Sequence, residues 1–258
     1  MKIGFFDSGI GGITVLHETL KLLPDEDYIY YADTKNVPYG VKDRETVKSC
    51  IMDSVNFIAG LGVKALVVAC NTATSIAIDD LRKKYDFPVI GMEPAVKPAI
   101  ENNDNKRVLV LATPLTLRED KFKNLVLRLD GDNIVDMLPF PELVELAEKF
   151  ELSENTVLPV LKEKLSGYDM NRYGTVVLGC THFPYFKCML RRILPKNISI
   201  VDGGTGTARN LKRTLEVRGN SNEGCGDIIF YESGNRVDGD SRLHKYLEVI
   251  DKVSRSDC

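Results

Sequence analysis

The amino-acid sequence predicts an α/β fold: two similar α/β domains with mainly parallel sheets, related by a pseudo-twofold axis, with a candidate active site in the cleft between them. Short apolar strands alternate with amphipathic helical stretches, which is typical of a parallel sheet covered by helices. The alternation restarts near residue 106. In each half, one apolar run ends in a cysteine, at Cys70 and at Cys180. This repeated arrangement favours an internal duplication.

The first half reads as four strands separated by helices. Apolar runs predict the strands at 2–7, 28–33, 64–70 and 88–92. Apolar residues at helical spacing predict helices over 12–23, 44–62 and 72–85. Pro24 follows the first of these helices and glycines end the second, as helix stop signals do.

The second half repeats this pattern, and a separate tail follows it. We expect strands at 106–116, 133–138, 174–180 and 198–204, with helices over 118–129, 141–150, 154–168 and 186–194. The polar stretch 217–227 connects to a strand at 228–234 and a helix at 241–250. Because a lone strand needs a sheet to join, the tail is assigned to the first sheet. The predicted domains are therefore 1–95 plus 210–258, and 96–209.

Composition excludes several classes of protein. The formal net charge is −3 and no basic run occurs, so no nucleic-acid partner is expected. No apolar run approaches the ~20 residues that cross a bilayer, and the N-terminus lacks a signal-peptide pattern, so we expect no membrane association and a cytoplasmic location. The six cysteines include no C-x-x-C pair and no zinc-ligand spacing, so free thiols and no metal are expected.

Polar residues stand where the predicted strands end. Asp7, Asp33, Cys70, Cys180 and Asp202 occupy such positions, and ligands of open parallel sheets bind there. If the two sheets face each other, the two cysteines line one cleft. The residues after each cysteine start helices, whose free N–H groups lower a thiol pKa and bind carboxylates.

Each of these cysteines has a candidate proton-transfer partner. Asp7 ends a strand of the same half as Cys70, and His182 lies two residues after Cys180. A buried cysteine at a strand end is otherwise an inert small apolar residue. That interpretation is accepted for the remaining cysteines, Cys50, Cys188, Cys225 and Cys258. The glycines of "DSGIGG" match neither the dinucleotide nor the Walker pattern, so they indicate a tight turn and close substrate approach.

Four motifs together resemble the glutamate racemase family. They are "FDSGIGG" at 6–12, "YYADTKNVPYG" at 30–40, "ACNTAT" at 69–74 and "GCTHFP" at 179–184. The resemblance implies a racemase without cofactor that interconverts L- and D-glutamate by two-base proton transfer and supplies D-glutamate for peptidoglycan. It also implies glutamate as the small-molecule partner and a homodimer.

The resemblance also implies a role for each motif residue. Cys70 would act on the D-isomer with help from Asp7, and Cys180 on the L-isomer with help from His182. A supporting position in 142–148 is assigned to Glu148, with Glu145 one turn away as the alternative. The residues expected to bind substrate are Asp7, Ser8, Tyr39, Gly40, Asn71, Thr72, Thr181 and His182. Those expected to support them are Asp33, Thr113, Thr116 and Glu148.

Three alternatives remain open from the residues alone. One is a related racemase for aspartate or another acidic amino acid. The second is a one-cysteine carbon-acid lyase, which needs only one of the two thiols. The third is a non-catalytic ligand-binding protein, which would tolerate Cys→Ser at both positions.

Overall fold

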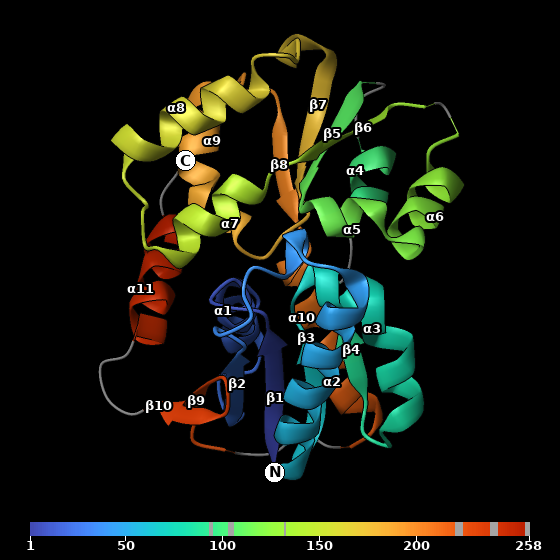
Figure 1. Ribbon diagram of the computed structural model, residues 1–258, viewed down its shortest axis with the longest axis vertical. Helices are drawn as coiled ribbons and strands as arrows, with labels where there is room; N and C mark the ends of the chain where they lie inside the picture. Colours follow the sequence, from blue (N-terminus) through green and yellow to red (C-terminus); the bar gives the residue numbers. More distant parts are fainter. Residues whose placement is uncertain (93–94, 103–105, 132, 220–223, 238–241, 256–258) are drawn as a thin grey trace.

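Two β-sheets lie end to end in the computed structural model, which describes residues 1–92, 95–102, 106–131, 133–219, 224–237 and 242–255 (Figure 1). The larger sheet has six strands in the order β10-β9-β2-β1-β3-β4, and only β10 runs antiparallel to its neighbour. The smaller sheet has four parallel strands in the order β6-β5-β7-β8. The α/β architecture with mainly parallel sheets is confirmed.

Apolar runs form the strands of both sheets. Every residue of β3 (Val63–Val68) is buried, and five of the six residues of β1 (Lys2–Asp7) are buried beside it. Such burial on both faces is expected for central parallel strands covered by helices. The other strands of the larger sheet are β2 (Tyr28–Ala32), β4 (Val89–Gly91), β9 (Ile228–Glu232) and β10 (Asn235–Val237). Those of the smaller sheet are β5 (Arg107–Ala112), β6 (Val135–Pro139), β7 (Tyr173–Leu178) and β8 (Ser199–Asp202).

Helices connect the strands and cover both sheets. Those of the first half are α1 (Ile13–Leu22), α2 (Arg44–Gly60), α3 (Asn71–Lys84) and the short η1 (Tyr39–Val41). Those of the second half are α4 (Val96–Glu101), α5 (Pro114–Arg118), α6 (Asp120–Leu129), α7 (Pro141–Glu148), α8 (Glu154–Leu165), η2 (Met170–Arg172), η3 (Phe183–Phe186) and α9 (Lys187–Ile193). The chain returns through α10 (Gly204–Val217) and ends in α11 (Arg242–Arg255).

Several elements differ from the sequence prediction, including the short helices α5 and η1 to η3 and strand β10. The strand expected over 106–116 ends at Ala112, because Thr113 caps α5 by accepting a hydrogen bond from Thr116 N and Pro114 stands at the first helical position. The helices α4 and α10 were not predicted. The strand expected over 198–204 ends at Asp202, whose side chain accepts a hydrogen bond from Gly204 N, the first residue of α10, at 2.8 Å.

The tail joins the larger sheet, as predicted. Strand β9 pairs in parallel with β2 along all five residues. Helix α11 then runs beside α1 and reaches η3 of the other half (Figure 1). The predicted domain boundaries stay a prediction, and the one between 209 and 210 falls within α10.

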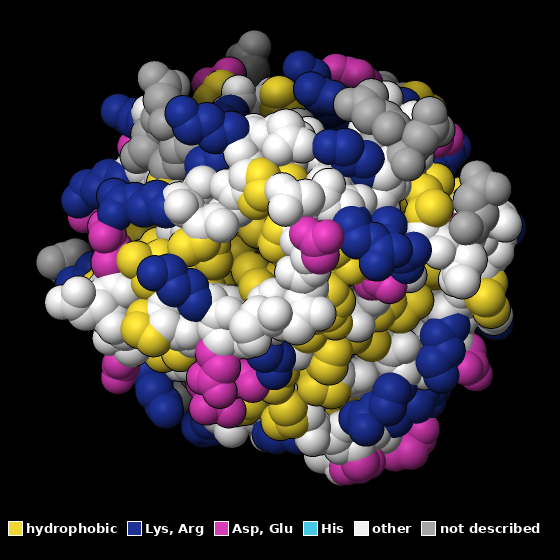
Figure 2. Space-filling model, turned by 90° about the horizontal axis from the view of Figure 1, so that it is seen from above, with side chains coloured by type: hydrophobic (Ala, Val, Ile, Leu, Met, Phe, Trp, Pro, Cys, Tyr) yellow, Lys and Arg dark blue, Asp and Glu magenta, His cyan; other side chains and the backbone are white. Residues whose placement is uncertain are grey.

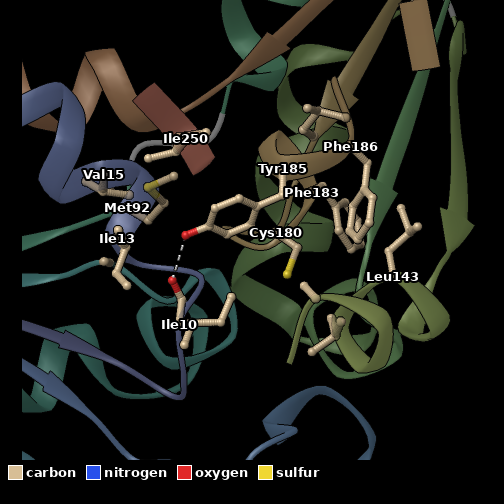
Figure 3. Close-up of a cluster of buried hydrophobic side chains, with 14 of the residues drawn as sticks. Ile10, Ile13, Val15, Met92, Leu143, Cys180, Phe183, Tyr185, Phe186 and Ile250 are labelled. Atoms are coloured by element: carbon tan, nitrogen blue, oxygen red, sulfur yellow. Dashed lines mark hydrogen bonds between the residues drawn. The ribbon is translucent and has the colours of Figure 1, made fainter. Parts of the chain in front are cut away.

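One apolar core continues from one half into the other. Ile10 and Ile13 of the first half pack in the same buried cluster as Phe183, Tyr185 and Phe186 of the second half (Figure 3). The Tyr185 hydroxyl donates a hydrogen bond to the Ile10 carbonyl at 3.1 Å. This contact brings the loop after β1 against the segment after β7.

The surface carries mixed charge. On the face that carries the four-stranded sheet, Lys and Arg side chains alternate with Asp and Glu around exposed apolar atoms (Figure 2). Over the ranges given above, no helix has the length and apolar character to cross a bilayer.

Candidate active site

The carboxyl ends of the two sheets face each other. The arrowheads of β1 and β8 point toward the same middle region from opposite ends of the molecule (Figure 1). Asp7 ends β1, Cys70 follows its neighbour β3, and Cys180 follows β7. The segments after these strands contain most of the side chains that the sequence singled out, and hydrogen bonds between the halves bring them together.

Cys70 caps helix α3. Its sulfur accepts a hydrogen bond from Ala73 N at 3.4 Å and donates to Ser8 Oγ at 3.8 Å. Burial and the nearby charge of Asp7 raise the pKa of the Cys70 thiol to about 12. The expected lowering of this pKa by the helix N-terminus is therefore wrong. The Ala73 N–H does favour the thiolate, but loss of water around a side chain only 5 % exposed outweighs it.

Asp7 connects the two halves of the site. This fully buried carboxylate accepts hydrogen bonds from Gly9 N at 2.9 Å and, across the interface, from Thr181 Oγ1 at 3.1 Å. Burial raises the pKa of Asp7 to about 6, although the His182 charge and both hydrogen bonds oppose the shift. A carboxylate with this pKa exchanges protons readily near neutral pH.

Cys180 stands at one end of a chain of charged groups. His182 Nδ1 lies 3.6 Å from the Cys180 sulfur, and His182 Nε2 lies 2.7 Å from Glu148 Oε1. Burial alone would lower the pKa of His182, but the hydrogen bonds and charges of Cys180 and Glu148 outweigh it and raise the pKa. Protonated His182 donates to both neighbours, and an adjacent imidazolium stabilises a thiolate. The two thiols thus have different environments.

Glu148 is the acidic residue of α7 that reaches the site. Its Oε1 also accepts a hydrogen bond from Ile10 N of the other half at 2.9 Å. Burial opposes ionisation of Glu148, but the hydrogen bond from His182 and nearby positive charges hold its pKa below the usual value. Of the two candidates in 142–148, the geometry therefore favours Glu148 over Glu145.

Asp33 and Tyr39 form a supporting cluster beside the Cys70 half. Asp33 Oδ2 accepts a hydrogen bond from the Tyr39 hydroxyl at 2.6 Å, and both Asp33 oxygens lie within 3.0 Å of Asn36 Nδ2. Ser233, from the turn between β9 and β10, donates to Asp33 Oδ1 at 3.1 Å. The loop that precedes η1 is therefore held by an internal carboxylate and by the C-terminal hairpin.

Three threonines meet where α3 approaches α5. The hydroxyl oxygens of Thr72, Thr113 and Thr116 lie 2.9 to 3.0 Å from one another. Asn71 comes directly before Thr72 in the chain, and its buried Oδ1 has no hydrogen-bond partner among the described residues. Asn71 and Thr116 also line a cavity of about 440 Å³ between α3, α4 and α6. The neighbouring hydroxyls are fixed, while the Asn71 oxygen is available to a ligand donor.

Glycines allow the two halves to come this close. A Cβ atom at Gly9 would lie 1.8 Å from Glu148 Oε1, and one at Gly11 would lie 2.4 Å from Thr181 Oγ1. At Gly40, a Cβ atom would lie 2.3 Å from the Cβ of Thr113. The prediction that the glycines of "DSGIGG" allow close approach thus has a structural counterpart, although what they approach is the other half of the protein.

Sequence reasoning missed two residues at this site, Ser233 and Arg242. Both lie in the C-terminal tail, 200 residues from Asp33 and 94 residues from Glu148 respectively. No local pattern marks them, because their contacts depend on how β9 and α11 pack.

Four cysteines lie outside the site, and one of them, Cys258, is outside the described residues. Cys225 is exposed and Cys50 partly buried, and both are free thiols, as expected. Cys188 is disulfide-bonded, which contradicts the expectation that the thiols are free. Within the described ranges, no three His, Cys, Asp or Glu residues are grouped as metal ligands would be.

Comparisons with known proteins identify the family of the chain. Residues 14–211 match the model of the Asp/Glu/Hydantoin racemase family. A glutamate racemase of Halothermothrix orenii is 57 % identical to this chain, and the match covers 98 % of this chain and 100 % of that protein. Glutamate racemase 2 of Bacillus subtilis is 52 % identical, and the match covers 99 % of this chain and 98 % of that protein. Among solved structures, this chain is similar to Escherichia coli glutamate racemase, crystallised in complex with L-glutamate and the activator UDP-MurNAc-Ala. The TM-score is 0.80 at 32 % identity, and the match covers 98 % of this chain and 95 % of that chain. The chain therefore belongs to the Asp/Glu/Hydantoin racemase family, and within that family to the glutamate racemases.

Proposed function

We propose that this protein interconverts L- and D-glutamate by passing protons between the substrate α-carbon and two cysteines, Cys70 and Cys180. Two observations carry the proposal: His182 Nδ1 lies 3.6 Å from the Cys180 sulfur, and the charge of buried Asp7 acts on the Cys70 thiol at the interface of the two halves. The Thr181–Asp7 hydrogen bond joins these two sets at 3.1 Å. Two opposed bases invert a stereocentre without turning the substrate over.

The proton transfers balance in each direction. From L-glutamate, the Cys180 thiolate removes the α-proton and the Cys70 thiol donates its proton to the opposite face of the carbanion. The enzyme is left with a Cys180 thiol and a Cys70 thiolate, which is the form that acts on D-glutamate. Asp7 and His182 return the protons between turnovers. The high pKa of Cys70 keeps this thiol protonated, as the reaction from L-glutamate requires.

Neutral donors and backbone groups surround the reacting centre in this proposal. Two substrate carboxylates require several donors, and the strand-end segments supply hydroxyls, an amide and N–H groups at the start of α3. The buried, unpaired Asn71 Oδ1 is an acceptor for the substrate ammonium. The residues assigned to substrate are Asp7, Ser8, Tyr39, Gly40, Asn71, Thr72, Thr181 and His182.

A direct assay tests the function. Purified protein is incubated with L-glutamate in the absence of pyridoxal phosphate, and chiral chromatography follows D-glutamate. We expect racemisation by the wild type, and a rate decrease of at least about 10³-fold in Cys70→Ala and in Cys180→Ala, since each removes an obligatory acid–base group. Cys225→Ala is the matched control and should retain full activity. Full racemisation by either active-site variant would contradict the two-cysteine scheme, and racemisation of aspartate alone would contradict the substrate.

The cellular setting is part of the same proposal. The enzyme acts in the cytoplasm as a homodimer and supplies D-glutamate for peptidoglycan. Expression in a bacterium that requires added D-glutamate should restore growth without it, and Cys180→Ala should not. Sedimentation analysis should give twice the chain mass of 28.8 kDa. A monomer that is fully active would contradict the homodimer.

A further inference from the structure

The C-terminal helix contacts the Cys180 half of the site through one charged side chain. Arg242, the first residue of α11, donates a hydrogen bond from Nη2 to Glu148 Oε2. The other carboxylate oxygen, Oε1, lies 2.7 Å from His182 Nε2 and accepts from Ile10 N. The two oxygens of Glu148 are thus divided between the active site and α11.

Packing in the next turn of α11 fixes this arrangement. The buried Tyr246 donates from its hydroxyl to the carbonyl of Ala147, the residue before Glu148. Its ring lies 5.4 Å from that of Tyr185, and the Arg242 guanidinium lies 5.7 Å from the Tyr246 ring. The end of α7 is therefore held from outside by two side chains of the same helix.

We propose that Arg242 is a positioning residue for proton transfer at Cys180: it holds the Glu148 carboxylate in the orientation that keeps His182 directed at the Cys180 sulfur. The proposal rests on the two-cysteine function above. The Glu148 side chain is only 11 % exposed, so the hydrogen-bond partners of its two oxygens determine its orientation, and Oε2 faces Arg242. Removing Arg242 leaves Oε2 without this partner and lets Glu148 turn away from His182.

Several groups share the environment of Glu148. His182 and Arg242 favour its ionised form, while burial opposes it. The charge of Glu148 in turn helps to raise the pKa of Asp7, Tyr30, Tyr185 and Tyr246, the titratable groups that face it. Loss of the Arg242 charge raises the pKa of Glu148. The acidic limb of the pH profile of kcat/KM should therefore move to higher pH in Arg242→Ala.

Isotope effects distinguish the two halves of the reaction, whereas rates do not. L- and D-glutamate are mirror images of equal free energy, so kcat/KM must be equal in both directions for every variant. The α-deuterium of L-glutamate is removed by Cys180, and that of D-glutamate by Cys70. In Arg242→Ala we expect kcat/KM to fall roughly tenfold. The deuterium isotope effect on kcat/KM should rise for L-glutamate and fall for D-glutamate, because the Cys180 step becomes slower than the Cys70 step.

Further variants make the test decisive. Arg255→Ala removes an arginine of the same helix that pairs with Asp251 at 2.9 Å, away from Glu148, and should behave as wild type. Arg242→Lys keeps the charge and should restore part of the activity. Glu148→Gln should abolish the effect of a second Arg242→Ala change, since Arg242 acts through Glu148. If Arg242→Ala does not fold, Arg242→Gln provides the same measurement without the charge.

The outcomes separate this inference from the function on which it rests. Unchanged isotope effects in Arg242→Ala, or equal changes for both isomers, would overturn the role of Arg242. The same response in Arg255→Ala would also overturn it. Absence of racemisation by the wild-type protein would instead overturn the proposed function.

Discussion

At the scale of single residues, the two thiols of the site differ in the charged groups that lie near them. Cys70 has a buried carboxylate with a pKa of about 6 nearby, and its own pKa is raised. Cys180 has a protonated imidazole that is supported by Glu148. The proposed two-cysteine mechanism therefore uses two unlike acid–base sets for a symmetric exchange between mirror-image substrates.

The cost of burying Asp7 leads to a stability prediction. Its folded-state pKa of about 6 lies above the ordinary value of 3.8 for an aspartate, so the native protein holds the proton more tightly than the unfolded chain. Stability from this residue is present at low pH and is lost as pH rises through about 6. Asp7→Asn should therefore raise the free energy of unfolding at pH 8 by up to about 3 kcal/mol, and by little at pH 4.

Urea unfolding at the two pH values checks this prediction. The activity of Asp7→Asn should fall by roughly 10²-fold or more, because the variant loses the base beside Cys70. A stabilisation that is equal at pH 4 and pH 8 would contradict the assignment of the effect to a buried charge.

At the scale of elements, the sequence predicts a helix or strand correctly where one local signal dominates. Continuous apolar runs identified β1, β3, β5 and β7, and the residues after them identified most of the site, because parallel strands deliver their carboxyl ends to one edge. Helix α10 was missed because its first residues include glycines and its N-cap is Gly203, which has no side chain to signal a helix start. Ser233 and Arg242 could not be found, because their contacts depend on tertiary packing of the tail.

The contact between η1 and α5 gives a prediction at this scale. A methyl group at Gly40 would meet the Cβ of buried Thr113 at 2.3 Å, and Thr113 is held by two other threonines. Gly40→Ala should lower the free energy of unfolding by roughly 1–3 kcal/mol, as overpacking does. It should also raise KM, since η1 must withdraw from the site.

Gly60→Ala is the matched control. This glycine lies at the end of α2, and its added Cβ would meet no atom within 4 Å. The change should stabilise the protein by up to about 1 kcal/mol without altering KM. Thermal unfolding and steady-state kinetics of both variants provide the comparison. A Gly40→Ala protein with the KM and stability of the wild type would show that the halves do not need this close contact.

At the scale of the whole molecule, the site is closed by the meeting of its two halves. Cys70 and Cys180 are only 5 % and 7 % exposed, while the apolar core and the Tyr185–Ile10 hydrogen bond continue across the interface. Substrate must therefore enter through an opening motion that separates these contacts. The C-terminal segment contacts both sides of the site, through Ser233 and Arg242.

Thiol labelling measures this opening. With a disulfide reagent, exposed Cys225 should react first, and Cys70 and Cys180 at least roughly 100-fold more slowly, since they react only in the open form. Mass spectrometry of tryptic peptides over time assigns each rate. If both buried thiols react as fast as Cys225, the closed arrangement is not the main form in solution.

The most direct test of the central claim is early proton exchange in deuterated water. Wild-type protein is allowed to convert a small fraction of the L-glutamate. The two isomers are then separated, and mass spectrometry measures the deuterium content of each. If Cys180 takes the proton and Cys70 donates another, the new D-glutamate carries deuterium at the α-carbon and the remaining L-glutamate keeps its protium. If one group serves both faces, the recovered L-glutamate gains deuterium as fast as product forms, or the product retains the original protium. Either result would contradict the two-cysteine account.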